Sequence, residues 1–421
     1  MYALLIVIFV LAYLGIVFEH PLKVNKAAFA LLAGVILWLI YGTMIPDRHL
    51  FEHHLEHHFV EISGILFFLL GAMTIVEIID GHKGFDVITS KISKLDLKYL
   101  FWIIGILSFL LSAILDNLTT TILMISLIKK MIDNGKLRWY LAGLVVISAN
   151  AGGAFSPIGD VTTTMLWIGG QVTTGKLIGH LLLPSILCFL APALMLYFML
   201  NKTRLLSEKP KLEGIRIEYD KSSVAILIIG VSSLISVPLI KALFHVPPYM
   251  GMLLGLGVMW LVTEIIARRR NDIDNTFTVS SALRNIDTPS IMFFLGILLS
   301  VGALQSAGVL TDLSGMLSRH LSSDKVLLFF TGIFSAIVDN VPLVAAFQGM
   351  YTLEQVPSDS AFWHLLAYAT GTGGSLLIIG SAAGVVAMGL ENINFGWYLK
   401  KISWLAAAGF ISGYLVLAIF S

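Results

Sequence analysis

The sequence SAILDNLTTT (112–121) decides the fold, because it places an aspartate, an asparagine and three threonines inside an otherwise apolar run. The sequence SAIVDNVPLV (335–344) repeats this interruption, and its Asp-Asn pair follows the first by 223 residues. An ionised aspartate at the centre of a membrane helix costs roughly 2.5–3.5 kcal/mol on insertion scales. Two such residues at matching positions therefore indicate a functional site.

The composition is that of a membrane protein. Of the 421 residues, 57% are hydrophobic and 13% are charged, whereas a soluble domain is about half apolar and a quarter charged. Many stretches approach the roughly 20 apolar residues that cross a bilayer, and none alternates as a barrel strand does. The net charge of +1 gives no indication of a nucleic-acid partner, and the single Cys188 excludes an internal disulfide. We expect an all-α polytopic membrane protein.

The apolar segments predict the order of the spans. Full or interrupted spans are expected at 1–18, 27–45, 62–79, 139–175, 177–200, 222–243, 249–267, 289–308, 363–390 and 397–420. The first is interpreted as a retained span, because a signal peptide has a basic flank before it and a small-residue cleavage site after it. The segments 99–132 and 325–353 carry the Asp-Asn pairs. Their halves are too short or too tightly joined to make two spans each, which predicts re-entrant hairpins.

The basic residues predict the orientation. If each hairpin returns to the face from which it starts, 22 of the 27 lysines and arginines fall on one side of the membrane, Lys26 among them. The positive-inside rule makes this side cytoplasmic. Both termini then lie outside, and we expect a location in a bacterial inner membrane.

A second motif repeats at nearly the same offset. The stretch ANAGGAFSPIGDVTTT (149–164) matches TGTGGSLLIIGSAAGV (370–385), 221 residues later, and the glycines in both predict broken helices. An odd number of spans separates the hairpins, so they open to opposite faces, as in the inverted repeats of many secondary transporters. The predicted parts are N-terminal scaffold helices (1–60), a first repeat (61–200), a cytoplasmic connector (201–221) and a second repeat with its scaffold helices (222–421).

The residues near the tips and breaks predict a cation site. Asp116, Asp160 and Asp339 are carboxylates in apolar surroundings, with amide and hydroxyl oxygens nearby, and hard cations prefer such ligands. No lysine, arginine or histidine lies near the tips in the sequence to hold an anion. Asp116 and Asp339 also suit helix N-caps, a role that is compatible with ion binding. The candidate ligands are Asp116, Asn117, Thr119, Thr120, Asn150, Ser156, Asp160, Thr163, Asp339, Asn340, Thr372 and Ser375.

Burial and a neighbouring carboxylate both favour the protonated form of an aspartate. A pair of such aspartates would be protonated without sodium and deprotonated with it. Asp116, Asp160 and Asp339 are thus expected to bind Na⁺ and H⁺ alternately, and alternating exposure of one such site gives an antiporter. No other cofactor is expected.

These motifs resemble the NhaD-type sodium/proton antiporters of the ion transporter superfamily, and SPIGDVTTT (156–164) is the most specific of them. The resemblance implies Na⁺, Li⁺ and H⁺ as transported ions, and a homodimer in lipid that moves in an elevator-like way. Dicarboxylate carriers of the superfamily have a Ser-Asn-Thr pattern at the hairpin tips. The acidic tips of this chain, Asp116-Asn117 and Asp339-Asn340, favour a cation instead.

Three alternatives stay open at this stage. The chain could be an anion or metalloid carrier of the same superfamily, such as a dicarboxylate or arsenite transporter. It could also be a sensor with a transporter fold, with the outer loop FEHHLEHHFVE (51–61) as its sensing element. In that loop the i, i+4 histidine pairs would suit a transition metal if they were helical. An enzyme is the least expected class, because no nucleophile–base pair stands at a break.

Overall fold

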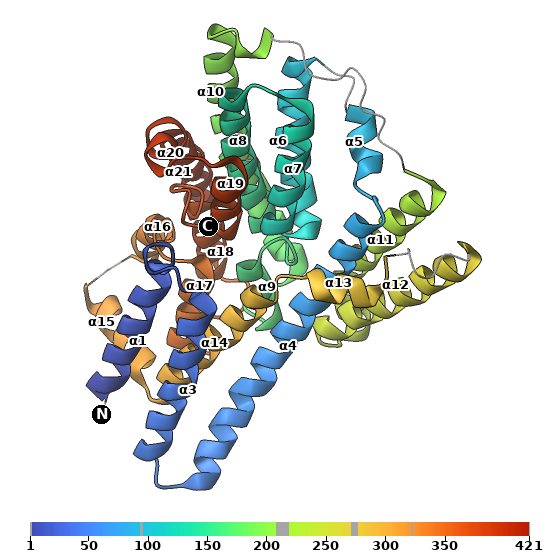
Figure 1. The fold of residues 1–421 in the computed structure, drawn as a ribbon. Coiled ribbons are helices and arrows are strands. Elements are labelled where there is room, and N and C mark those ends of the chain that lie inside the picture. The colour runs from blue at the N-terminus through green and yellow to red at the C-terminus, as the bar shows by residue number, and fades with distance from the viewer. Residues whose placement is uncertain (1, 93–95, 208–218, 271–276, 321–322, 421) are drawn as a thin grey trace.

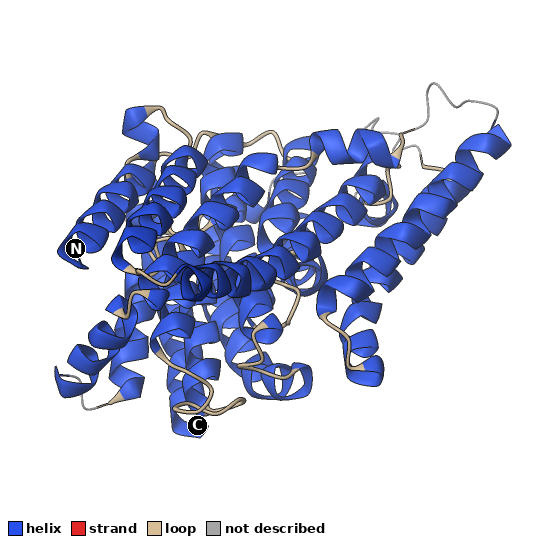
Figure 2. Cartoon of the chain, turned by 90° about the horizontal axis from the view of Figure 1, so that it is seen from below, coloured by secondary structure: helices blue, strands red, loops and turns tan. Residues whose placement is uncertain are grey.

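The computed structural model describes residues 2–92, 96–207, 219–270, 277–320 and 323–420, and these residues form helices and loops without a strand (Figure 2). Eight of the described helices are long and apolar enough to cross a membrane. They are α3 (Lys26–Met44), α4 (Arg48–Gly81), α6 (Leu97–Leu115), α10 (Thr174–Lys202), α11 (Lys221–Phe244), α12 (Pro248–Arg270), α14 (Thr288–Ser306) and α21 (Ser403–Phe420). The prediction of an all-α polytopic membrane protein is confirmed.

The helices fall into two groups that are offset from each other (Figure 1). One group holds α6, α7 (Asn117–Met131), α8 (Gly135–Ala154) and α10, which extend to the top of the view. The other holds α1 (Tyr2–Val17), α3 and the first half of α4, which extend to the bottom. α3 packs along α14, and α10 packs along α21 and α8. We call these the upper group and the lower group.

The first Asp-Asn pair forms the tip of a helical hairpin. α6 ends at Leu115 and α7 begins at Asn117, so that Asp116 alone reverses the chain, with φ 88° and ψ 160°. This backbone conformation is rare for a residue with a side chain, and such residues concentrate at functional sites. α6 has 19 residues and is long enough to cross a membrane by itself, so shortness does not apply to this half, but the one-residue link to α7 agrees with the expectation that the halves are tightly joined. Re-entry from one face stays a prediction.

The second pair lies in the corresponding place. α16 (Asp324–Phe334) ends before a turn, and Asp339 caps α17 (Asn340–Met350) by accepting from the Val341 amide.

Both glycine-rich breaks are also present. α8 gives way to α9 (Val161–Ile168), and α18 (Ala361–Gly373) to α19 (Ala382–Glu391). The remaining described elements are α2 (Glu19–Leu22), α5 (Asp86–Ile92), η1 (Leu205–Ser207), α13 (Val279–Asn285), α15 (Val309–His320) and α20 (Phe395–Lys401).

The two halves use the same contacts to join a hairpin to a broken helix. Ser112 donates a hydrogen bond to the Ala149 carbonyl, and Ser335 donates one to the Thr370 carbonyl. These four residues are related by the offsets of the sequence motifs, 223 and 221 residues. The same internal plan thus appears twice, while opposite orientation of the halves in a membrane stays a prediction.

Glycines allow these close contacts in both halves. A Cβ on Gly152 would overlap the Phe109 carbonyl oxygen, and a Cβ on Gly373 would overlap the Gly332 carbonyl oxygen. Overlap with backbone cannot be relieved by a rotamer change, so any side chain here forces the helices apart. Glycine is therefore needed at both positions for the hairpin to pack on its broken helix.

Three sequence expectations are corrected by the helix bounds. Residues 51–61 are part of α4 rather than a loop, because Asp47 caps the helix at its start and the helix continues for 34 residues. At 1.5 Å per residue it measures about 51 Å, longer than the roughly 30 Å hydrocarbon core. The last predicted span, 397–420, is divided at Ile402 into α20 and α21. The break predicted within 139–175 is followed by a second interruption before α10, at 169–173. Residues 208–218 of the predicted connector lie outside the described residues.

Candidate cation site

Both hairpin tips and the first helix break meet at one cavity of about 70 Å³. The chain reverses or restarts a helix at each of these points, so each presents polar groups where the surrounding sequence is apolar. We call this the tip cavity. Its charged and amide-bearing lining residues are Lys26, Asp116, Asn117, Asp160, Asp339 and Asn340. The remainder of its wall is mostly apolar; α4 contributes the most residues to it, Phe68 among them, and the hairpins, the breaks and α11, α12 and α14 contribute one to three each.

Asp160 is the centre of the polar contacts. It caps α9, and its Oδ1 accepts hydrogen bonds from the Thr162 amide at 2.9 Å and from the Thr162 hydroxyl at 2.8 Å. Its Oδ2 accepts one from Asn117 Nδ2 at 2.7 Å. Asn340 Nδ2 lies 3.5 Å from both carboxylate oxygens. Asp160 is 2% exposed, and four donors from both repeats thus surround a buried carboxylate.

Asp116 contributes a second carboxylate. It caps α7, with Oδ1 accepting from the Thr119 amide at 2.7 Å and Oδ2 from the Thr119 hydroxyl at 2.9 Å. The predicted cap role of Asp116 is therefore present, and the same residue lines the tip cavity. Neutral donors that hold a carboxylate favour its charged form. These hydrogen bonds fix the Asp116 carboxylate in the wall of the cavity that Asp160 also lines.

Asp339 contributes the third carboxylate, with a partner that the sequence did not predict. Lys26 Nζ lies 2.8 Å from Asp339 Oδ2 and forms an ion pair with it. Lys26 was expected to belong only to a basic cytoplasmic loop, and no basic residue was expected near the tips. That expectation is wrong, because α3 begins at Lys26 and directs its first turn toward the second hairpin tip.

An asparagine joins the two broken helices. Asn150 Oδ1 accepts from Asn117 at 3.0 Å, and its Nδ2 donates to the hydroxyls of Ser375 and Ser381, both at 2.9 Å. Asn150 is fully buried. It links the first hairpin tip to the second break and does not line the tip cavity.

The other predicted ligands serve mainly local contacts. Ser156 donates to the Ala113 carbonyl, Thr163 to the Asp160 carbonyl and Thr372 to the Tyr368 carbonyl. Thr119 lines a neighbouring cavity rather than the tip cavity. The Thr120 hydroxyl is buried and has no hydrogen-bond partner among the described residues. Ser156, Thr163 and Thr372 thus bind backbone carbonyls and do not line the tip cavity.

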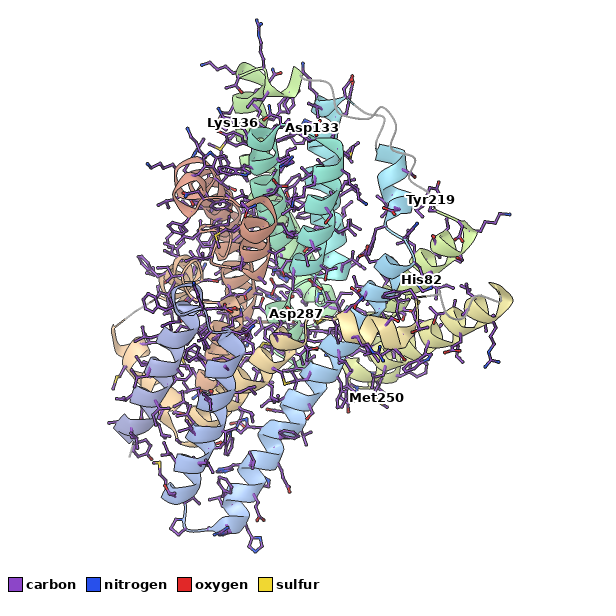
Figure 3. The ribbon with its side chains drawn as sticks, in the orientation of Figure 1. His82, Asp133, Lys136, Tyr219, Met250 and Asp287 are labelled. Carbon is purple, nitrogen blue, oxygen red and sulfur yellow. The ribbon has the colours of Figure 1, made fainter. Side chains whose placement is uncertain are left out.

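A larger cavity of about 450 Å³ adjoins the tip cavity, and Met73, Val76 and Leu118 line both. Four carboxylates line it, and one lysine; these are Glu77, Asp80, Asp86, Asp287 and Lys130. Lys130 Nζ is 3.6 Å from Asp86 Oδ1, and Asn285 donates to Glu77. Such an excess of negative charge attracts cations and repels anions. Figure 3 shows Asp287 and His82 at mid-height, below Lys136 and Asp133.

The histidine segment lies in α4, far along the chain from the tips. His57, His58 and Glu61 come within 4.8 Å of one another through their possible ligand atoms. His58 also contacts the Ser306 hydroxyl of α14 at 3.1 Å, which holds the ring against the neighbouring helix. None of the three residues lines the tip cavity.

The chain is similar in sequence to known transport proteins. The model of the citrate transporter family (CitMHS) matches residues 13–373. The chain is 45% identical over 406 residues to sodium/proton antiporter 1 of Arabidopsis thaliana, covering 96% of this chain and 70% of that protein. It is 43% identical to sodium/proton antiporter 2 of the same plant, over 96% of both proteins. It is 32% identical to the Na⁺/H⁺ antiporter NhaD of Alkalimonas amylolytica, over 91% of this chain and 83% of that protein. The chain therefore belongs to the NhaD-type sodium/proton antiporters, within the family that the citrate transporter model describes.

Proposed function

We propose that this membrane protein exchanges Na⁺ for H⁺ at the tip cavity, with Asp160 and Asp116 as the carboxylates that bind the two ions alternately. The observation that carries the proposal is the convergence of three carboxylates and two amides on one small cavity. Relatives that are 32–45% identical are named sodium/proton antiporters. The family is one of transporters, so the chain is not an enzyme.

The size of the tip cavity supports an ion as the substrate. Its volume of about 70 Å³ has room for an ion with a few waters, since about 10–15 Å³ of such space holds one water. Pockets for organic ligands measure about 300–1,000 Å³. The cavity that adjoins the tip cavity reaches this size, at about 450 Å³, and four carboxylates line it. Three carboxylates against one lysine would also repel an anion. The anion alternative is thus disfavoured, although the matching family model is described as a citrate transporter.

The contacts of Asp160 support direct competition between the two ions. Its donors are neutral amides and hydroxyls, which stabilise the charge but do not cancel it. A bound proton or a bound Na⁺ can neutralise this negative charge. Once one of the two ions is bound, no charge is left on the carboxylate to hold the other. The side-chain amides of Asn117 and Asn340 each carry an oxygen as well as a nitrogen. After rotation these amides would offer oxygen ligands to a sodium ion beside the carboxylates.

The offset of the two helix groups supports elevator-like movement. Lys136 and Asp133 at the top of Figure 3 are predicted to face the cytoplasm, and so are His82 and Asp287 at mid-height. Helix ends that reach the same membrane surface should lie at one level. We infer that the upper group, which carries the first hairpin and its broken helix, moves relative to the lower group along the direction of this offset. The acidic cavity of about 450 Å³ lies beside the tip cavity and would be its access route in this state.

The proposal is tested by proton movement in proteoliposomes that contain the purified protein and a pH-sensitive dye. Vesicles loaded with acid are diluted into Na⁺, Li⁺, K⁺ or citrate at external pH values from 6 to 9. We expect proton exit on adding Na⁺ or Li⁺, and none with K⁺ or citrate. A response to citrate alone, or no response to Na⁺ at any pH, would refute it. Crosslinking of the protein in lipid tests the predicted homodimer separately.

A further inference from the structure

A cluster of two histidines and a glutamate lies on α4, apart from the tip cavity. His57 Nδ1 and His58 Nδ1 each lie 3.9 Å from Glu61 Oε2. The cluster follows from the helix itself, because residues three and four positions apart lie on the same face. Among the described residues, these are the only three histidine, cysteine or acidic side chains whose possible metal-ligand atoms all lie within 4.8 Å of one another.

The distances within the cluster suit a transition metal after a small movement. Zn²⁺ binds imidazole nitrogen and carboxylate oxygen at about 2.0–2.2 Å, so its tetrahedral ligand atoms lie about 3.3–3.5 Å apart. The two N–O distances of 3.9 Å are only slightly longer. The side chains of His57 and Glu61 are 60% and 62% exposed. Both can therefore rotate toward a shared metal ion without disturbing the packing of the helix.

His58 is the fixed member of the cluster. Its side chain is 13% exposed, and its Nε2 lies 3.1 Å from the Ser306 hydroxyl at the end of α14. When Nε2 donates its hydrogen to Ser306, Nδ1 carries the free lone pair, and Nδ1 is the atom that faces Glu61. Metal-binding histidines almost always donate their other ring N–H to an oxygen in this way. A contact outside the cluster thus orients the ring as a ligand.

A glycine of α14 provides the space for this ring. A Cβ on Gly302 would lie 3.0 Å from Cγ of His58 and 3.2 Å from its Nδ1, which is tighter than ordinary van der Waals contact. Trp38 of α3 packs against the same ring, with 5.9 Å between the ring centres. Helices α3 and α14 therefore hold His58 in place, while His57 and Glu61 stay exposed.

The cluster also borders a cavity of its own. His58 and Glu61 line a cavity of about 300 Å³, whose wall includes residues of α9, α14 and α17. We call it the histidine cavity, and it shares no lining residue with the tip cavity. About 10–15 Å³ of such space holds one water. The histidine cavity therefore has room for water to complete the coordination of a metal ion.

We propose that His57, His58 and Glu61 bind one divalent transition-metal ion, for which Zn²⁺ is the probe. Two imidazoles and one carboxylate, with water in the fourth position, make an open tetrahedral site. Imidazole nitrogen suits Zn²⁺, Cu²⁺ and Ni²⁺, whereas Mg²⁺ and Ca²⁺ take oxygen ligands. This site is independent of the proposed antiport, because none of its three ligands lines the tip cavity.

Variants of the cluster separate metal binding from folding. His57→Gln and Glu61→Gln each remove a ligand from an exposed position, so the protein should fold as the wild type does. Loss of the hydrogen-bond partner behind a metal-binding histidine costs about 10–100-fold in affinity, so Ser306→Ala should fall in this range and loss of a ligand should cost more than about 100-fold. His49→Gln is the matched control, because His49 is an exposed histidine of the same helix outside the cluster.

The experiment measures Zn²⁺ binding to the whole chain in detergent, purified without a histidine tag. The protein competes with a coloured Zn²⁺ chelator in an excess of Na⁺ and Mg²⁺, which occupy sites made of oxygen ligands, and the unfolding temperature of each variant is recorded. We expect one Zn²⁺ per chain, lost in His57→Gln and Glu61→Gln, while His49→Gln binds as the wild type does. No binding by the wild type, or binding that both ligand variants retain, would overturn the proposal. Equal weakening by His49→Gln would also overturn it, because the metal would then lie elsewhere along the histidine segment.

Discussion

Replacement of Asp160 by asparagine should abolish Na⁺/H⁺ exchange while leaving the protein folded. The Asp160 side chain has two structural duties, the cap of α9 through the Thr162 amide and the hydrogen bond from Asn117. Asparagine caps helices as well as aspartate does, and its amide oxygen can accept either hydrogen bond. The variant keeps the cap of α9 and removes the buried charge, but its amide nitrogen replaces the oxygen that accepts from Asn117 unless the Asn117 amide rotates to present its oxygen. The removed charge and the lost hydrogen bond offset each other, so we expect the protein to stay folded with an unfolding temperature near that of the wild type.

The loss of ion affinity follows from the lost charge. A Na⁺ about 2.5 Å from a carboxylate oxygen interacts with it by about 6–7 kcal/mol at an effective dielectric constant of about 20. Desolvation of both charges offsets much of this. Even one third of it, about 2 kcal/mol, corresponds to a ~30-fold weaker binding. The proton that Na⁺ displaces is also missing, so exchange fails even at saturating Na⁺.

Two measurements on the same protein check this prediction. The first is Na⁺-driven proton exit from proteoliposomes, and the second is the increase in unfolding temperature that Na⁺ gives the protein in detergent. The matched control is Asp47→Asn, because Asp47 also caps a helix, by accepting from the His49 and Leu50 amides, and does not line the tip cavity. The control should behave as the wild type does in both. An Asp160→Asn protein that exchanges Na⁺ for H⁺ with wild-type KM would refute the assignment of the ion to this carboxylate.

Three further predictions concern packing, the amide network and pH. Gly152→Ala should lower the free energy of unfolding by about 1–3 kcal/mol, because its Cβ overlaps the Phe109 carbonyl oxygen. The control is Gly175→Ala, whose Cβ meets no atom within 4 Å and which should leave the thermal unfolding temperature unchanged. Asn117→Ala removes a donor to the buried Asp160 carboxylate, which costs about 1–3 kcal/mol. Its KM for Na⁺ should rise between about 5-fold and 100-fold, and an unchanged KM would exclude the amide from the site. Because protons and Na⁺ compete, the wild-type KM for Na⁺ should rise up to about tenfold per unit as pH falls below the transition, whereas a fall in maximal rate at constant KM would contradict competition.

The sequence was sufficient to locate the carboxylates of the site. Asp116 and Asp339 interrupt apolar runs, and Asp160 follows a glycine-rich break, so each polar residue stands out against its surroundings. Their convergence could be expected because the two motifs recur at nearly one offset. In the structure these residues line one cavity, and their binding of Na⁺ stays a proposal.

The contacts between distant segments could not be predicted in this way. Lys26 and Asp339 are 313 residues apart, and their pairing depends on how α3 packs against α14. In the sequence Lys26 is one of many basic residues beside a span. Asn150 similarly reaches Ser375 and Ser381 across 225 and 231 residues. The sequence does show that Lys26 is the first residue of an apolar helix. The direction in which this helix places the Lys26 side chain depends on packing alone.

The continuity of α4 also escaped prediction. Its first part is polar, with five histidines among residues 49–58, so hydropathy indicates a loop before Ile62. The helix is nevertheless continuous from Arg48, because Asp47 caps it and Trp38, Tyr41 and Phe51 pack together at its base. Hydropathy identifies the residues that are apolar enough to lie in the lipid. It therefore gives no signal for a polar part of a helix that extends beyond the membrane.

The most direct test of the account is the release of protons when Na⁺ binds to the purified protein. Na⁺ is added to the detergent-solubilised protein in weakly buffered solution, and the change in pH is recorded from pH 6 to 9, with K⁺ as the control ion. If Na⁺ and H⁺ share the carboxylates of the tip cavity, Na⁺ releases protons at low pH, and the number released falls to zero at high pH. Binding of Na⁺ without proton release at every pH would contradict the central claim that one site holds the two ions in turn.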